Sequence, residues 1–341
     1  MKKSFLKPVN TFSAISLLFC SNCFDLNTMK RKIIAFVFIA AILAAGVSFL
    51  IPSRVKIDET VFVKAKKNTV NRAINDIHLW KKWWPGSESN TSPINALRYN
   101  NTIYEPQLPG LYAVAIGVKY GSNSYKTILS IVEYNADSVL LSWKGSISVS
   151  SNPFTRISRY MHAKRVGDDM KNILYAAQKF MSDLQNVYGI AITNQIVKDT
   201  LLLNTQAVFT HPPSTDEIYT LINKLAKAAE DEKAPVTGYP MMNITKEDGS
   251  TYLLRVALPV SQPVKEEHGI VIKRMVRGNI LVSNDITGGR IAVEHACKQM
   301  MNYVHDFNKT LAAISFQSLI TNRQLEKDST KWITRIYCPV I

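Results

Sequence analysis

The longest uncharged stretch of the chain runs from Ile33 to Ile51, with Ser48 as its only polar member and Pro52 directly after it. A helix of this length spans about 28 Å, close to the thickness of the hydrocarbon core of a bilayer. The pattern predicts a single transmembrane anchor at residues 29–53, behind an extension, residues 1–28, that suggests a misassigned start. A cleaved signal peptide ending near residues 44–46 is the alternative, although such signals have apolar cores of only about 7–15 residues.

Alternating apolar and charged positions from Val55 to Val63 predict a β-strand after the anchor. A short helix follows, with Asn68 as its predicted N-cap. Strand-like segments separated by turn residues come next, at 110–120, 125–134 and 138–148. Apolar residues at three- and four-residue steps from Met170 to Val187 then predict a long amphipathic helix.

This is a helix-grip order, and residues 54–188 resemble the START-like superfamily, also called SRPBCC or polyketide cyclase-like. The resemblance lies in the first strand, in Asn75-Asp76 and in Trp80-Lys81-Lys82-Trp83-Trp84-Pro85, a beginning typical of many membrane-anchored bacterial members. It implies a curved sheet wrapped on a long helix around an apolar cavity. Trp80 and Trp84 would line that cavity or contact lipid; the alternative is that they fill the core, since a buried aromatic side chain removes roughly 150–250 Å² from water.

The remaining residues, 189–341, contain an internal repeat. The segment 250–260 aligns with 331–340, so that Tyr252 matches Trp332, Arg255 matches Arg335, and both segments end in Pro-Val. A helix precedes each: Ser214 and Glu217 form a capping-box signature for the first, and apolar residues from Met300 to Leu311 mark the second. Predicted strands precede these helices, at 192–203 in one copy and at 270–277 and 290–295 in the other. Two strand-helix-strand-strand units can pair into one sheet with a groove at their junction.

The duplication resembles the GyrI-like domain, the effector-binding domain of bacterial transcription activators. The supporting segments are 237–240, 256–260 and, most specifically, 332–340. The resemblance implies a small-molecule groove lined by aromatic residues, with an acidic residue that receives cationic ligands. Here Arg335 stands at that acidic position, so an anionic or neutral ligand is at least as consistent with the sequence. The predicted fold is therefore α+β: an N-terminal transmembrane helix, a helix-grip START-like domain (54–188) and a duplicated GyrI-like domain (189–341).

The predicted ligand-binding residues of the second domain are four aromatic and two charged side chains: Tyr239, Tyr252, Glu294, Trp332, Arg335 and Tyr337. About half of such aromatic residues are expected in the core or at the rim, and Arg335 could instead pack its stem on the sheet. Glu294 and His295 could form an acid/base pair, but neighbours on a strand point to opposite faces. Cys297 and Cys338 could form a disulfide, although two free thiols are the preferred interpretation.

The chain has 341 residues and a formal net charge of +15. Of its charged residues, 24 Lys/Arg and 11 Asp/Glu precede residue 189, so the excess surrounds the apolar segment and the second domain is nearly neutral. This distribution fits a membrane-proximal region, and no nucleic-acid motif accompanies it. We therefore predict no nucleic-acid partner, an insertion in the membrane through Ile33 to Ile51 and an extracytoplasmic body. The oligomeric state does not follow from the sequence.

These patterns contain no paired carboxylates, His/Cys cluster or cofactor motif, so we expect no metal and no cofactor. The leading hypothesis is non-catalytic binding or sensing of a hydrophobic or amphipathic small molecule near the membrane. The enzyme alternative is a hydrolase or cyclase acting on a small ester or lactone, with Glu294 as its acid or base. A scaffold in an envelope stress pathway, with its cavities filled by side chains, is a third hypothesis.

Overall fold

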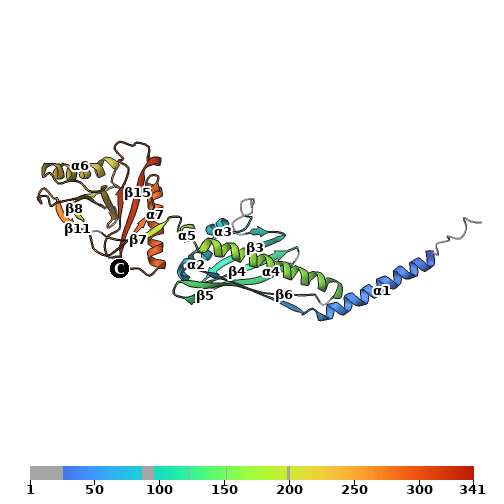
Figure 1. Ribbon diagram of the computed structural model, residues 1–341. Coiled ribbons are helices and arrows are strands. Elements are labelled where there is room, and N and C mark those ends of the chain that lie inside the picture. The colour runs from blue at the N-terminus through green and yellow to red at the C-terminus, as the bar shows by residue number, and fades with distance from the viewer. Residues whose placement is uncertain (1–25, 87–95, 122, 151, 198–199) are drawn as a thin grey trace, which may run out of the picture. The chain divides into compact units, whose positions relative to one another are not determined.

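The computed structural model describes residues 26–86, 96–121, 123–150, 152–197 and 200–341 (Figure 1). All but the last three residues of the predicted extension, 1–28, lie outside these ranges. The described chain divides into two compact units. One comprises the residues up to Val55 together with Ile147–Arg165, and the other comprises Lys56–Ser146 and Val166–Ile341. The predicted domain boundary at residue 188 stays a prediction.

Helix α1, Leu26–Leu50, contains most of the predicted membrane segment. Its residues Met29–Ser48 are long and apolar enough to cross a membrane, and only 6% of the segment is buried. A signal sequence near an N-terminus passes the same test of length and composition. Membrane insertion and the side on which the rest of the chain lies therefore stay predictions.

The first sheet has six strands in the order β1-β6-β5-β4-β3-β2. The pairs from β2 to β6 are antiparallel. The strands are β1 Arg54–Val63, β2 Leu97–Tyr99, β3 Thr102–Gly110, β4 Ala113–Tyr120, β5 Asn123–Asn135 and β6 Ser138–Ser148. Two short helices, α2 (Lys67–Asn75) and α3 (Ile77–Trp83), follow β1. The long helix α4 (Pro153–Met181) and the short helix α5 (Leu184–Tyr188) follow β6.

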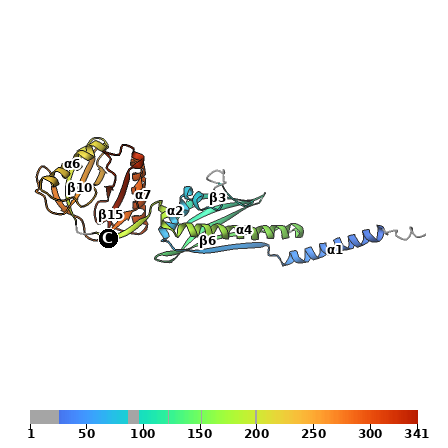
Figure 2. The same ribbon diagram turned by 45° about the horizontal axis from the view of Figure 1, so that its top comes forward.

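Helix α4 lies along this sheet in both views (Figures 1 and 2), as a helix-grip order requires. Its buried residues Met170, Ile173, Leu174, Ala177 and Met181 follow the predicted three- and four-residue steps. The helix begins much earlier than predicted, at Pro153, and α5 is separate from it. The prediction of Asn68 as an N-cap was wrong: the cap is Lys66, whose side chain makes no capping bond.

The second sheet has nine strands, eight of them in the order β11-β8-β10-β9-β14-β15-β12-β7, with β13 paired to β15. All of these pairs are antiparallel. The strands are β7 Ile192–Ile196, β8 Leu201–Phe209, β9 Met241–Lys246, β10 Tyr252–Val260, β11 Val271–Arg274, β12 Asn279–Ser283, β13 Ile286–Thr287, β14 Phe316–Leu319 and β15 Ile333–Val340. Two segments of strand-helix-strand-strand order thus meet at β9 and β14.

Helices α6 (Thr215–Asp231) and α7 (Arg290–Asp306) pack against this sheet (Figure 2). The capping box predicted for α6 is present, because the Ser214 hydroxyl accepts from Glu217 N–H and the Glu217 carboxylate accepts from Ser214 N–H. The strand predicted at residues 290–295 was wrong, because these residues form the first turns of α7. Val293, Ala296, Met300 and Val304 are its buried positions, at helical spacing.

Candidate functional site

Three of the predicted ligand-binding residues line one groove: Tyr252, Glu294 and Trp332. Its volume is about 340 Å³, within the roughly 300–1,000 Å³ typical of small-molecule pockets. Tyr252 begins β10, Glu294 lies in the second turn of α7, and Trp332 directly precedes β15. The other lining residues are Pro212, Pro213, Thr215, Ile218, Met242, Ile244, Lys246, Arg290, Val293, Gln317 and Arg323. We call this cavity the helix-side groove.

The register of the sheet explains why these residues meet. Directly paired residues of antiparallel strands point to the same face, and Tyr252 pairs with Lys246 while Gln317 pairs with Met242. The Lys246 Nζ atom lies 5.8 Å from the centre of the Tyr252 ring, a cation–π contact. Helix α6 adds Ile218 from one side and α7 adds Val293 from the other. The groove therefore has an apolar floor with charged groups among its lining residues.

Arg323 is the buried charge of the helix-side groove, and the sequence analysis did not identify it. Arg323 is only 8% exposed. Its Nη2 atom donates a hydrogen bond to Thr334 Oγ1 at 2.7 Å, and its guanidinium carbon lies 4.7 Å from the centre of the Trp332 ring. The backbone N–H of Arg323 donates to the hydroxyl of buried Tyr219 on α6, which fixes its segment against the helix. Burial lowers the pKa of Arg323 from its ordinary value.

Glu294 forms an i,i+4 ion pair with Arg290 at 2.8 Å, and both side chains are exposed, Glu294 by 61%. Its neighbour His295 lines a different pocket, beside Asn284, Asp285 and Ser329. Glu294 and His295 do not point to opposite faces of a strand, as predicted, because their segment is helical. The two residues nevertheless do not share a pocket in this structure.

Arg335, Tyr337 and Tyr239 do not line the helix-side groove. Arg335 follows Thr334 on β15, so its side chain points to the opposite face of the sheet, where Nε and Nη2 donate to Asp285 at 2.8 and 2.7 Å. Tyr337 stacks on Phe316 with ring centres 5.0 Å apart. Tyr239 is 53% exposed. The structure thus separates the predicted residues of this domain into two groups.

That opposite face has a pocket of its own, of about 220 Å³. Its lining is mostly apolar and includes Met241, Ala313, Ile314 and Phe316. Arg255 lies there as well and donates to Asn243 Oδ1 and Thr245 Oγ1. The side-chain partners of Arg255 are therefore neutral amide and hydroxyl oxygens.

The first sheet has an aromatic cluster where the resemblance implies a cavity. Trp80 and Trp84 are 1% and 2% exposed and stack with ring centres 5.8 Å apart. Trp84 also contacts the buried rings of Tyr104 and Trp143. The indole N–H groups donate to backbone carbonyls, Trp80 to Ile74 and Trp84 to Arg98. Because both side chains are almost fully buried and bonded to the backbone, they contribute to the core of this part of the chain.

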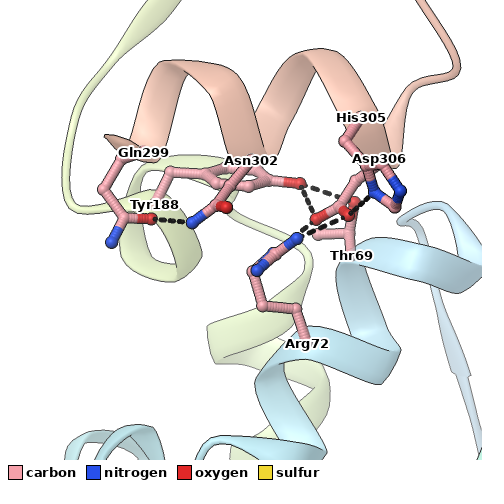
Figure 3. Close-up of polar contacts among 7 residues, drawn as sticks. All are labelled: Thr69, Arg72, Tyr188, Gln299, Asn302, His305 and Asp306. Atoms are coloured by element: carbon pink, nitrogen blue, oxygen red, sulfur yellow. Dashed lines mark hydrogen bonds and ion pairs between the residues drawn. The ribbon is translucent and has the colours of Figure 1, made fainter. Parts of the chain in front are cut away.

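A polar cleft lies between α2 and α7 (Figure 3). Arg72 on α2 binds the carboxylate of Asp306, the last residue of α7, through Nε at 2.6 Å and Nη2 at 2.8 Å. The Tyr188 hydroxyl donates to the same carboxylate at 3.0 Å and lies 3.0 Å from Thr69 Oγ1. Burial is the largest of the effects that raise the pKa of Tyr188, and the Asp306 charge adds to it. The Asp306 side chain is only 2% exposed, and the Arg72 guanidinium supplies its counter-charge.

Cys297 and Cys338 are free thiols, in agreement with the preferred interpretation of the sequence. Burial raises the pKa of Cys297 to about 11 and also raises that of Cys338, so both are protonated at neutral pH. In the described ranges, no three His, Cys, Asp or Glu side chains are grouped so that they could hold a metal ion.

No protein-family model matches this chain, and no curated protein matches it. Several solved structures are similar. The C-terminal domain of EcmrR is 16% identical, with 45% of this chain and 98% of that domain covered at a TM-score of 0.39. SAV2435 bound to tetraphenylphosphonium is 13% identical, with 44% and 94% covered and a TM-score of 0.31. A START superfamily protein from Mycobacterium smegmatis is 15% identical, with 34% and 94% covered and a TM-score of 0.22.

These structures include proteins of both kinds that the sequence resembles, GyrI-like and START-like. Identities and TM-scores this low do not assign the chain to a family. The functional argument therefore depends on the groove and its residues.

Proposed function

We propose that this protein binds a hydrophobic or amphipathic small molecule in the helix-side groove, without transforming it, close to a membrane in which α1 is inserted. The observation that carries the proposal is the groove itself, because it combines an apolar floor with two aromatic side chains, Tyr252 and Trp332, and a few charged groups. This combination is what small-molecule sites usually offer. The exposed apolar surface of α1 supports the membrane location.

Ligand binding is proposed for the second sheet alone. In the first sheet, the side chains of Trp80, Trp84, Tyr104 and Trp143 are buried and contact one another, which supports a closely packed interior there. The first sheet therefore fits the hypothesis of a scaffold with a filled cavity, and the second fits the hypothesis of a binding module.

The test uses the full-length chain purified in detergent. Native mass spectrometry is expected to detect a co-purified small molecule, and a ligand library is expected to contain compounds that raise the melting temperature. Trp332→Ala should abolish both effects, whereas Tyr175→Ala, which removes a half-exposed aromatic ring from α4, should preserve them. An empty wild-type protein without thermal shift across the library would contradict the proposal.

The enzyme alternative has less support. An acid/base carboxylate is usually buried so that its pKa is shifted toward neutrality, but Glu294 is 61% exposed and paired with Arg290. We expect no turnover of esters or lactones by the wild-type protein. Turnover that disappears in Glu294→Gln would favour a hydrolase or cyclase over a binding protein.

A further inference from the structure

The helix-side groove contains a buried guanidinium that has no acidic partner among the described residues. Arg323 donates one side-chain hydrogen bond, to Thr334, and its Nε atom has no hydrogen-bond partner in the described structure. A guanidinium carries five N–H donors and stays charged at neutral pH. Removing such a charge from water without a counter-charge is costly unless another group compensates for it.

The other charges around the groove do not supply that compensation. The lining residues include three cationic side chains, Lys246, Arg290 and Arg323, but only one carboxylate, Glu294. That carboxylate is bound to Arg290 at 2.8 Å and is largely exposed. The groove therefore has an excess of positive charge, and the buried part of this excess belongs to Arg323.

Arg323 lines the groove and has donor capacity that no described residue uses, although its Nε atom is itself buried. The Trp332 ring covers a face of the guanidinium, with 4.7 Å between the ring centre and Cζ. On the guanidinium itself, Nη2 is bonded to Thr334, and the Nε–H group has no partner among the described residues. Carboxylates bind guanidinium groups through parallel N–H···O bonds.

We propose that the helix-side groove recognises an amphipathic carboxylate, with the carboxylate on Arg323 and the apolar body against Trp332, Tyr252 and the floor residues Met242 and Ile244. This inference rests on the proposed function and names the class of its ligand. The apolar floor favours an organic carboxylate over free phosphate, which guanidinium groups also bind.

The experiment measures the binding of four probes to the full-length protein in detergent by titration calorimetry, with the micelles alone as the blank. The probes are 2-naphthylacetate, its neutral analogue 2-naphthylacetamide, the cation tetraphenylphosphonium and inorganic phosphate. Naphthylacetate is expected to bind at least about tenfold more tightly than the amide, because a hydrogen bond to a charged group contributes more than one to a neutral group. It should also bind at least about tenfold more tightly than phosphate, which has no apolar body.

Arg323→Met should remove the preference for naphthylacetate over the amide and leave the affinity for the amide within about twofold. Lys227→Met, an exposed change on α6, should preserve the preference. The melting temperature of ligand-free Arg323→Met should be equal to or higher than that of the wild type, because replacing an uncompensated buried charge by an apolar group relieves desolvation. A residue needed only for folding would give the opposite shift.

Equal affinity of the wild-type protein for naphthylacetate and the amide would overturn the inference, and this comparison needs no variant. Phosphate that binds as tightly as naphthylacetate would overturn the carboxylate assignment. Binding of the amide or of tetraphenylphosphonium without binding of naphthylacetate would overturn the anion site and leave the proposed function in place. Binding of none of the probes, together with an empty protein in native mass spectrometry, would overturn the proposed function itself.

Discussion

Arg72 and Asp306, 234 positions apart in the sequence, form a two-pronged ion pair with nitrogen–oxygen distances of 2.6 and 2.8 Å (Figure 3). The two side chains are 29% and 2% exposed. Removing one partner of a buried pair leaves the other charge uncompensated, which costs on the order of 3 kcal/mol. We expect Asp306→Asn to lower the free energy of unfolding by about that amount in urea titrations of the detergent-solubilised protein. Asp231→Asn, at the exposed end of α6, is the matched control, and an equal effect of both changes would contradict this prediction.

Substitutions of two neighbouring tryptophans in the aromatic cluster should lower the free energy of unfolding by different amounts. Trp84→Phe removes the hydrogen bond from the indole nitrogen to the Arg98 carbonyl, whereas the indole nitrogen of buried Trp83 has no partner among the described residues. Leaving a buried acceptor without its donor costs about 1–3 kcal/mol. Trp84→Phe should therefore reduce the free energy of unfolding by about that much more than Trp83→Phe does. A loss of naphthylacetate binding in folded Trp84→Phe would instead support the sequence-based prediction that Trp84 contacts a ligand.

The capping box of α6 predicts a pH-dependent stability. Ser214→Ala should cost about 1 kcal/mol, the usual value for an N-cap hydroxyl, whereas Ser261→Ala, at an exposed loop residue, should cost almost nothing. Hydrogen bonds from the Ser214 N–H and hydroxyl lower the pKa of Glu217. The ionised carboxylate therefore stabilises the fold above its unfolded pKa of about 4.3, and this contribution is lost as the pH falls through the lower folded pKa. The stability difference between wild type and Glu217→Gln should be present at neutral pH and disappear in strong acid.

Asp169 on α4 should show the opposite dependence. Burial raises its pKa, against the hydrogen bonds from Asn100 and Thr102, which lower it. The folded state then binds more protons than the unfolded state, so the contribution of Asp169 to stability falls as the pH rises from about 3.9 through the folded pKa. The free energy of unfolding of the wild type, minus that of Asp169→Asn, should therefore decrease over this range. Urea midpoints measured between pH 4 and 7 test it, and a constant or rising difference would contradict it.

Local signals in the sequence predicted the local features correctly. The Ser214–Glu217 box involves only residues three apart, and the strand-like segments predicted at 125–134 and 138–148 between turn residues form β5 and β6. The error at residues 290–295 came from reading the apolar Ile291 and Val293 as a strand. The helical spacing of Val293, Ala296 and Met300 was a usable signal, and following it would have extended the predicted helix back to Arg290.

The positions of the candidate site residues depend on contacts that no local sequence pattern contains. The buried position of Arg323 comes from Tyr219 and Thr334, which hold its backbone and side chain from α6 and β15. Arg335 was predicted as a ligand anchor, but Asp285, fifty positions away, binds it on the opposite face. Of the predicted site, Tyr252, Glu294 and Trp332 line one groove, and the first and last of these are the residues that the predicted repeat aligns.

Helix α7 connects two sites. Its residue Glu294 lines the helix-side groove, and its last residue, Asp306, binds Arg72. Glu294 and Asp306 are twelve positions apart, or about 18 Å along a helix. Binding equilibria at two ends of one element obey thermodynamic reciprocity. If Asp306→Asn changes the affinity of the groove by some factor, then occupancy of the groove must change the stability cost of Asp306→Asn by the corresponding free energy. A single pair of titrations, with and without the ion pair, would therefore measure in both directions whether an event at the groove reaches α2.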